Sequence, residues 1–398
     1  MTPDGRADSR AHPAHQARLT VAACGVLLAG LIAVDMPNPA LPAIVAGLDT
    51  TQSAMKQLVA AYLLALAAAQ LVYGRLSDRH GRRPALLLGL ALATLGLAAS
   101  AVAGSIGQLG AARLLTACGA AACTVTSRAI LVDVLRGERA LRRGFAAFTM
   151  ASQLSPALAP LLGSALLACC GWRAIFATLA AISALTLLGV ARALPETHRQ
   201  TDARAGGATG AYRRLLRDRR FVVHSAAAAL IMSFTQGFYT MAPYAFAALG
   251  YPPKVNAACY ALYAGAVLSA SWAVTRLRRG AAQAYPAAAW ALAAVTAGAA
   301  WLGVDRDAWR IALFALLLGA SCGVAAPLAM SASLGDLERD RGAASALQGT
   351  IKMGGAGLCL LAFDAVDIDG FGVAAKVLFG FAVALLALLL GSRAGLRR

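Results

Sequence analysis

The sequence predicts an all-α integral membrane protein with many membrane-spanning helices. Of its 398 residues, 59% are hydrophobic and only 14% are charged, and the mean hydropathy is +0.66. A soluble chain is about half apolar and about a quarter charged, so both values indicate a membrane environment. Residues 145–170 and 371–391 form apolar runs, the second broken only by Lys376. Runs of about twenty such residues cross a hydrocarbon core about 30 Å thick as helices.

Twelve such spans follow one another along the chain, separated by polar segments. They cover approximately residues 19–46, 54–75, 84–104, 107–133, 144–168, 173–192, 221–247, 256–275, 282–303, 310–334, 343–363 and 371–391. A polar tail, 1–18, leads into the first span without a cleavage site, so we expect that helix to be retained. The longest polar segment, 193–220, contains Gly and is rich in Arg, which predicts a linker. The predicted domains are the tail 1–18, six-helix bundles at 19–192 and 221–391, the linker 193–220 and a tail at 392–398.

Lysine and arginine are distributed unequally between the two sides of the predicted membrane. The tails and the segments after every second span hold 27 of the 36, and the opposite side holds five. Because cytoplasmic loops are enriched in Lys and Arg, this asymmetry places the linker and both termini in the cytoplasm. The other four lie within spans: Arg113, Arg128, Lys352 and Lys376.

The same distribution argues against a nucleic-acid partner, despite a net charge of +18. A nucleic-acid-binding domain gathers its basic residues on one soluble face, whereas these lie in short clusters between apolar segments. The eight Cys show no CxxC or Cys/His spacing, and six fall inside apolar segments, so we expect neither a metal site nor a disulfide framework. The sequence also shows no set of nucleophile and base and no phosphate-binding loop, which argues against a membrane enzyme.

The densest group of charges is the segment YGRLSDRHGRRP, residues 73–84, between the second and third spans. Its two Gly supply backbone freedom at a tight reversal, and Pro84 suits the first turn of the next helix. We expect Asp78 near the N-terminus of that helix, where a carboxylate is favoured. The Arg residues can bind carboxylates or helix ends across an interface, which would form a latch that opens and closes. An ordinary cytoplasmic loop explains the charge equally well.

Two further residues, Arg128 and Asp133, lie near the cytoplasmic end of the span 107–133, within reach of this segment if the helices are close. Asp133 is a candidate partner for the Arg residues of the segment, with an ordinary surface salt bridge as the alternative. The residues assigned to the latch are Gly74, Asp78, Arg79, Gly81, Arg82, Arg83, Arg128 and Asp133.

The spacing G-R-L-S-D-R-x-G-R-R closely resembles motif A of the major facilitator superfamily, which occupies the loop between helices 2 and 3. Arg113, in RLLTACGAAA, resembles the helix-4 motif B arginine, and SPALAPLLGS at 155–164 resembles motif C, the helix-5 antiporter motif. With VDMPNPALPAI, GWRAIF, LPET and RGAASALQGTIKM, the set is similar to the Bcr/CflA group of drug-resistance transporters. The resemblance covers essentially the whole chain. It implies a major facilitator fold in the bacterial inner membrane, with two related six-helix halves around a central cavity.

The chain departs from these motifs at several positions. Motif B usually carries a Gln and a Gly where this chain has Thr116 and Ala117, and three motif C glycines are replaced by Ser or Ala. Small-for-small exchanges keep the close helix approach that small residues allow, but they weaken the implied direction of antiport. The replaced glycines are Ser155, Ala159 and Ser164, and the residues assigned to motif C are Pro156, Pro160 and Gly163.

Asp35 is a carboxyl that the sequence places deep within a span, about 24 Å along the first helix. Ionisable groups at such depth are costly and by default mark a pathway. Pro residues at 37, 39 and 42 favour a broken helix that lines a cavity. A carboxyl that moves between apolar surroundings and a neighbouring cation would load and release a proton. The alternative is a structural carboxylate that caps the broken helix.

Arg113 enters its span from the outer side and reaches a depth similar to that of Asp35. The resemblance implies that a motif B arginine takes part in proton coupling, and we hypothesise that it pairs with Asp35. The alternative is an Arg whose side chain extends to the outer interface.

Lys352 lies about 14 Å into the eleventh span, at a position where the resembled group more often has an uncharged residue. It should face protein or water. It could contact an anionic or hydrogen-bonding substrate, neutralise a buried carboxylate or extend to the interface, and its charge argues against a site for strongly cationic drugs. The predicted substrate-binding residues are Asp35, Tyr62, Gln70, Tyr239, Met241, Tyr244 and Lys352. The aromatic ones are also the kind that anchor helix ends at the membrane interface.

Together with these patterns, the resemblance implies a proton-coupled exporter of small drug-like compounds that works by alternating access. Its expected partners are a small-molecule substrate, protons and the lipid bilayer, and we expect a monomer with no cofactor beyond the proton gradient. Two alternatives remain open. One is a proton-coupled importer of a small metabolite or weak anion, which the direction of flux distinguishes, and the other is a receptor of transporter fold that no longer transports.

Overall fold

The computed structural model describes residues 13–135, 138–197, 207–276, 281–334, 341–365 and 371–395, and these contain helices and no strand. The helices are α1 (Pro13–Asp35), the 3-10 helix η1 (Asn38–Ala40), α2 (Leu41–Gly47), α3 (Gln52–His80), α4 (Arg82–Ala101), α5 (Ile106–Val134), α6 (Glu138–Ala193), α7 (Gly207–Arg217), α8 (Arg219–Ala248), α9 (Pro253–Arg276), α10 (Ala281–Trp301), the 3-10 helix η2 (Val304–Arg306), α11 (Ala308–Leu334), α12 (Arg341–Ala365) and α13 (Phe371–Gly395).

These helices account for the twelve predicted spans. Ten helical stretches in the described ranges are long and apolar enough to cross a membrane. One of them, Leu154–Ala193, holds two spans, because α6 contains Gly171 in a non-helical conformation, with φ of 78° and ψ of 175°. The alanine-rich α10 completes the twelve.

The first span is interrupted after Asp35, where the sequence predicts a break. α1 ends at that residue, and η1 and α2 follow within one apolar stretch, Gln16–Gly47. Pro39 and Pro42 lie in the first turns of η1 and α2. Because Pro has no backbone N–H and clashes with the preceding turn, the helix cannot continue through these positions. The break leaves Asp35 at a helix end inside the bundle.

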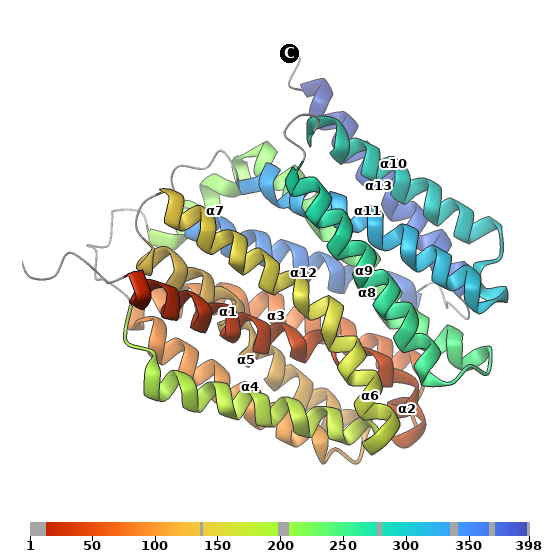
Figure 1. The fold of residues 1–398 in the computed structure, drawn as a ribbon, viewed down its shortest axis with the longest axis horizontal. Coiled ribbons are helices and arrows are strands. Elements are labelled where there is room, and N and C mark those ends of the chain that lie inside the picture. Colours follow the sequence, from red (N-terminus) through yellow and green to blue (C-terminus); the bar gives the residue numbers. More distant parts are fainter. Residues whose placement is uncertain are drawn as a thin grey trace, which may run out of the picture.

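The helices form two halves, α1–α6 and α8–α13, which lie one below the other in Figure 1. The halves meet where α3 packs against α12 and α6 packs against α9. One buried apolar cluster includes side chains of both halves, among them Leu63 of α3 and Phe363 of α12. The functional residues described below lie along this interface.

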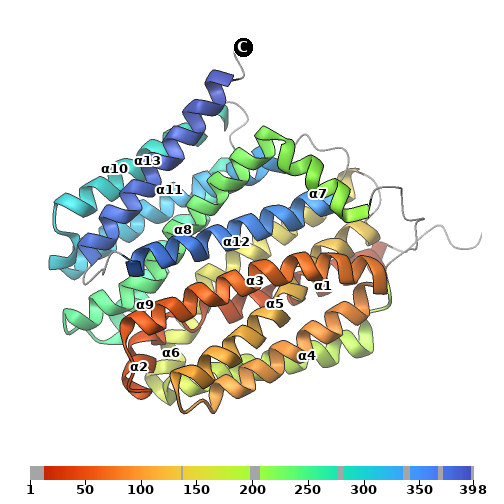
Figure 2. The same cartoon turned by 180° about the vertical axis from the view of Figure 1, so that it is seen from behind.

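α7 lies within the segment that the sequence predicts as a linker. Figure 2 shows it at one end of the bundle, with α2 at the opposite end. We call these the α7 end and the α2 end. Leu215 of α7 is buried together with Phe221 of α8 and with Ala344 and Leu347 of α12, so this helix is packed onto the second half.

Candidate functional site

A cavity of about 270 Å³ lies between the two halves. Helices α1, α3, α4, α5 and α6 line it from the first half, and α8, α9, α11 and α12 line it from the second. It extends to the α7 end, where Asp78, Arg82, Asp133 and Tyr212 form part of its lining. A cavity reached by both halves is where a transporter built from two repeats holds its substrate.

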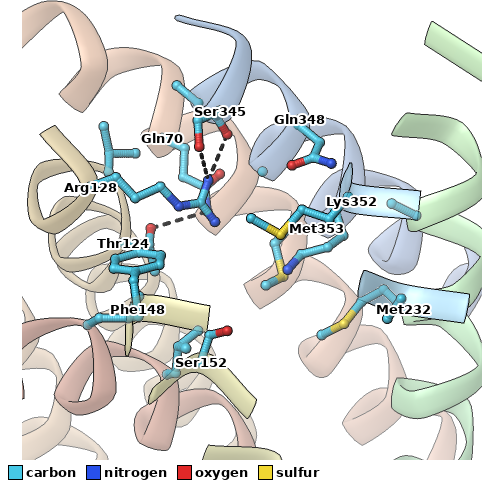
Figure 3. Close-up of a pocket in the computed structure, with 18 of the residues that line it drawn as sticks. Gln70, Thr124, Arg128, Phe148, Ser152, Met232, Ser345, Gln348, Lys352 and Met353 are labelled. Carbon is cyan, nitrogen blue, oxygen red and sulfur yellow. Dashed lines mark hydrogen bonds between the residues drawn. The ribbon is translucent and has the colours of Figure 1, made fainter. Parts of the chain in front are cut away.

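Polar side chains gather along part of the cavity lining, shown in Figure 3. We call this group the polar wall, and it consists of Gln70, Thr124, Arg128, Ser345, Gln348 and Lys352. The surrounding lining is apolar and includes Met232, Met353 and Phe148. An apolar cavity with a few convergent polar groups is typical of a small-molecule site.

Arg128 joins the two halves across the polar wall. Its Nη1 donates to the backbone oxygen of Ser345 at 2.8 Å and to the Ser345 hydroxyl at 2.7 Å. Its guanidinium carbon lies 5.3 Å from the centre of the Phe148 ring. On the same wall, Gln70 Nε2 donates to the Thr124 hydroxyl at 3.3 Å. Arg128 is therefore both a contact between the halves and a cation facing the cavity.

Lys352 reaches the cavity from α12, opposite Arg128 in Figure 3. Within the described ranges it forms no ion pair or hydrogen bond, but its charge interacts with those of Arg128 and Asp35. The sequence left three placements open for Lys352: contact with a substrate, neutralisation of a buried carboxylate, or extension to the membrane interface. The structure places it in the cavity lining and not at the interface.

Asp35 is buried close to the cavity without lining it, with 4% of its surface exposed. The Ser155 hydroxyl donates to its Oδ2 at 2.9 Å. The Gln236 side chain of α8 and the Lys352 ammonium also interact with this carboxylate. Groups from both halves thus converge on Asp35, and one of them, Lys352, also faces the cavity.

Motif C packs closely around this carboxyl. Ser155 supplies the hydroxyl donor, and Gly163 lies against the broken end of α1, where a Cβ would come 2.1 Å from the carbonyl oxygen of Met36. Pro156 lines the cavity, and its carbonyl accepts from Tyr239 Oη at 2.5 Å. Pro160 is buried in the same helix. The motif therefore connects the Asp35 region to the second half.

The hypothesis that Arg113 pairs with Asp35 is wrong for this structure. Arg113 is buried, its Nη1 donates to the carbonyl of Ala33 at 3.0 Å, and its guanidinium stacks on Tyr62 at 3.9 Å from the ring centre. The α1 carbonyl and the aromatic face satisfy the cation, while Ser155 satisfies Asp35. Arg113 binds the backbone two residues before Asp35 and therefore helps to fix the position of the α1 end.

The predicted substrate-binding residues divide into two groups. Gln70 and Lys352 line the large cavity, whereas the others lie outside its lining: Asp35, Tyr62, Tyr239, Met241 and Tyr244. Tyr239, Met241 and Tyr244 are buried in the apolar core, and Tyr62 lies beneath Arg113. Tyr239 of α8 points toward the first half, where its hydroxyl donates to the Pro156 carbonyl, and its own carbonyl accepts from Tyr260 of α9 at 2.8 Å.

At the α7 end, the motif A segment forms a network centred on Arg82. Arg82 is buried, its Nε donates to Asp133 Oδ2 at 2.8 Å, and its Nη1 donates to the Ser77 hydroxyl at 3.1 Å and to Asp78. Arg83 instead donates from Nη2 to the carbonyl of Ala191 at 2.7 Å. Arg79 is exposed. The network ties α3, α4 and α5 together beside the cavity.

The carboxylate on the N-terminus of α4 is Glu196, and not Asp78 as expected from the sequence. Glu196 accepts from the backbone N–H of Arg82 at 2.9 Å and of Arg83 at 3.1 Å, whereas Asp78 lies in α3 and binds the Arg82 side chain. Gly81 has a φ of 99°, and a Cβ there would come 2.5 Å from the Glu196 carboxylate. A residue without a side chain is therefore required at this reversal.

Gly74 of α3 leaves room for Tyr212 of α7. A Cβ at this position would lie 3.1 Å from Tyr212 Oη, so the absence of a side chain allows the Tyr212 hydroxyl to lie against α3. Burial, together with the Asp78 charge, raises the pKa of the Tyr212 phenol. Tyr212 supplies a neutral hydroxyl to the lining at the α7 end.

The residues with structural roles that were not predicted as site residues include Ser155, Glu196 and Tyr212. Two of them carry a signal in the sequence, because Ser155 replaces a motif C glycine and Glu196 belongs to LPET. Neither signal indicates which residue is the hydrogen-bond partner, because that residue lies more than a hundred positions away in the sequence in each case. Tyr212 lies in a polar segment with no comparable signal.

Two six-helix halves around a shared cavity, with buried charges at their interface, define this protein as a multi-pass membrane transporter and not an enzyme. The comparison with known families agrees. Residues 23–359 match the model of the Major Facilitator Superfamily, and the chain belongs to that family.

Several bacterial relatives have names that refer to drug resistance. The chain is 40% identical over 156 residues to the chloramphenicol resistance protein of Pseudomonas aeruginosa, covering 38% of this chain and 36% of that protein. It is 32% identical over 174 residues to multidrug resistance protein D of Escherichia coli (strain K12), covering 44% of each. The match to the uncharacterized MFS-type transporter YdgK of Bacillus subtilis (strain 168) is 30% over 273 residues, covering 67% of this chain and 68% of that one.

A solved structure supports the fold. The crystal structure of a D-xylose-proton symporter superposes with a TM-score of 0.73 at 18% identity, covering 93% of this chain and 96% of that one. At this identity the similarity establishes the fold alone.

Proposed function

We propose that this transporter exports small drug-like compounds from the cytoplasm across the bacterial inner membrane, as a monomer, in exchange for protons. The names of the Pseudomonas and Escherichia relatives support the substrate class. The asymmetry of Lys and Arg supports the orientation, with the α7 end and both termini in the cytoplasm.

The observation that carries the proposal is the position of Lys352 between the cavity and Asp35. Lys352 lines the cavity, and its charge interacts with the buried Asp35 carboxylate. A substrate that binds beside Lys352 therefore changes the surroundings of Asp35, and a proton on Asp35 changes the surroundings of the substrate. Such coupling between two binding events is reciprocal, which is what exchange of a substrate for a proton requires.

The remaining site residues fit an alternating-access cycle. Rocking of the halves would break the Arg128–Ser345 contact at the α7 end or the Tyr239–Pro156 contact nearer the α2 end, and the motif A network would hold α3, α4 and α5 together as the first half moves. The proton gradient is the energy source, worth about 2.3 kcal/mol for each charge that crosses per 100 mV. No other cofactor enters this scheme.

Uptake of labelled chloramphenicol into inside-out vesicles tests the proposal, because one relative is named for resistance to this compound. With an acid-inside pH gradient, vesicles that contain the protein should accumulate the compound, and a protonophore should abolish the accumulation. Accumulation that is the same without a gradient would contradict proton-driven export.

A second candidate is the proton-coupled import of a small anionic metabolite, which Arg128 and Lys352 in the cavity favour. Direction of flux separates the two. Import predicts accumulation in right-side-out vesicles with an acid exterior, and export predicts none there. A chain that binds compounds but moves none in either orientation would be a receptor of transporter fold.

A further inference from the structure

Two cations of the cavity lining form no ion pair with a carboxylate of the described residues. The lining contains the acidic residues Asp78 and Asp133, and both are bound to Arg82 at the α7 end. Among the described residues, Arg128 donates hydrogen bonds only to the neutral Ser345, and the carboxylate whose charge acts on Lys352 is Asp35, which lies outside the lining. The polar wall therefore presents two positive charges to the cavity, and of these only Lys352 is partly offset by a carboxylate.

The two cations can act on one ligand. Arg128 comes from α5 in the first half, Lys352 comes from α12 in the second, and both side chains reach the same cavity in Figure 3. Their charges interact, which raises the energy of the empty cavity because like charges repel in surroundings of low dielectric. An anion placed beside them would relieve that repulsion.

Further hydrogen-bond donors lie at the same position. The Arg128 Nε is buried without a hydrogen-bond partner in the described part of the chain, and the Gln70 amide, which has two N–H groups and donates one to Thr124, lies on the same wall. A carboxylate accepts several hydrogen bonds at once, and bonds from a charged donor are the stronger ones. The donor set thus fits an acidic group better than a neutral carbonyl.

The apolar lining indicates the remainder of the ligand. Met232, Met353, Ile231 and Phe148 lie in the cavity wall near the cations. Methionine side chains adapt to ligands of different shape, and an aromatic ring offers a flat apolar contact. A cavity of about 270 Å³ with such a wall is built for an organic molecule and exceeds what an inorganic anion would fill.

We propose that this transporter prefers anionic amphipathic compounds, with a carboxylate or similar acid held between Arg128 and Lys352 and an apolar body against the methionine-rich wall. The inference rests on the proposal above that this cavity is the substrate site. It goes beyond that proposal by naming the charge class of the substrate.

The test compares two probes of nearly equal size, 1-naphthylacetate and its neutral analogue 1-naphthylacetamide, by direct binding of the labelled compounds to purified protein in nanodiscs at pH 7.5. We expect the wild type to bind the acid at least about tenfold more tightly, a ratio that corresponds to about 1.4 kcal/mol. Lys352→Met should remove most of this preference, and Lys352→Arg should keep it, because the arginine retains the charge.

Lys376→Met is the matched control, because it removes a lysine from the exposed side of α13, away from the cavity. It should leave the preference unchanged. Equal binding of the two probes to the wild type, binding of neither, or a preference that survives Lys352→Met would each overturn the inference. The Lys352→Arg variant shows whether loss of binding reflects lost charge or lost folding.

The result separates this inference from the export proposal. Proton-driven uptake of chloramphenicol without any preference for the acid would leave export standing and overturn the inference. Preferential binding of the acid without transport in any vesicle would leave the inference standing and overturn export.

Discussion

Glu196 is a single side chain that connects the end of the first half to motif A. It accepts hydrogen bonds from the first two backbone N–H groups of α4, although it is 114 residues from Arg82 in the sequence. A carboxylate at a helix N-terminus satisfies free donors and interacts favourably with the helix dipole. Glu196 thereby fixes the reversal at Gly81 that places Arg82 beside Asp133.

We predict that Glu196→Ala lowers the stability of the purified protein by about 0.5–1 kcal/mol, the lower part of the range for loss of a helix cap, because the side chain is exposed. Thermal unfolding in detergent would show this as a lower midpoint temperature. Arg79→Ala removes a charge from the same segment at another exposed position and should leave the midpoint unchanged. Equal midpoints for Glu196→Ala and the wild type would show that the cap contributes nothing.

At the scale of an element, α6 is also positioned by contacts with a distant part of the chain. Its motif C stretch packs against the broken end of α1, and its Ser155 binds Asp35. Small residues allow helices to approach closely in membranes, where apolar burial provides little attraction. Gly163 is the position where this approach is tightest, because it meets the carbonyl oxygen of Met36.

Gly163→Ala should therefore destabilise the protein by about 1–3 kcal/mol, the usual cost of overpacking a filled interior, and should displace Met36 and Asp35. Its matched control is Gly189→Ala in the same helix, where nothing lies within 4 Å of a new Cβ. Thermal unfolding of both variants makes the comparison. If the two alanines have the same effect, α6 and α1 are not packed as described.

α7 was not predicted, and the reason lies in its environment. Residues 193–220 are polar on average, which is typical of a linker, and the short helix inside them exposes Arg213, Arg214 and Arg217. Ala211 and Leu215 are buried, and Leu215 packs against the second half. A helix of eleven residues is marginal alone, so its formation depends on a surface that the linear sequence does not show.

At the scale of the whole molecule, the halves are held together at two levels. Arg128 bonds Ser345 toward the α7 end, and Tyr239 bonds Pro156 deeper in the bundle. Hydrogen bonds from a charged donor contribute about 1.5–3 kcal/mol, so loss of the first contact should favour states open at the α7 end.

Cys322, which lines the cavity, can report this opening. In a background where the other seven Cys are replaced, Arg128→Gln should increase labelling of Cys322 by a membrane-impermeant maleimide in inside-out vesicles by roughly tenfold. Arg79→Gln, at an exposed position of motif A, should not change the rate. Slower or unchanged labelling in Arg128→Gln would mean that this contact does not close the α7 end.

Much of the architecture could be predicted, because it depends on local properties of the chain. Hydrophobic runs predict the twelve spans, and the prolines after Asp35 predict the break in the first one, as the structure shows. The hydrogen-bond partners of buried polar groups could not be predicted in the same way. Ser155 lies 120 residues from Asp35, and Arg113 finds a backbone carbonyl in place of the expected carboxylate, since charge alone does not determine which donor or acceptor is nearest after folding.

The most direct test of the account is proton movement in inside-out vesicles with an acid-inside gradient, recorded as chloramphenicol and 1-naphthylacetate are added to wild type and to Asp35→Asn. Asparagine keeps the size of the side chain and can still accept the Ser155 hydrogen bond, but it cannot carry a proton. We predict that at least one compound dissipates the gradient in the wild type and that neither does so in Asp35→Asn. Equal dissipation in both proteins would contradict proton coupling through Asp35.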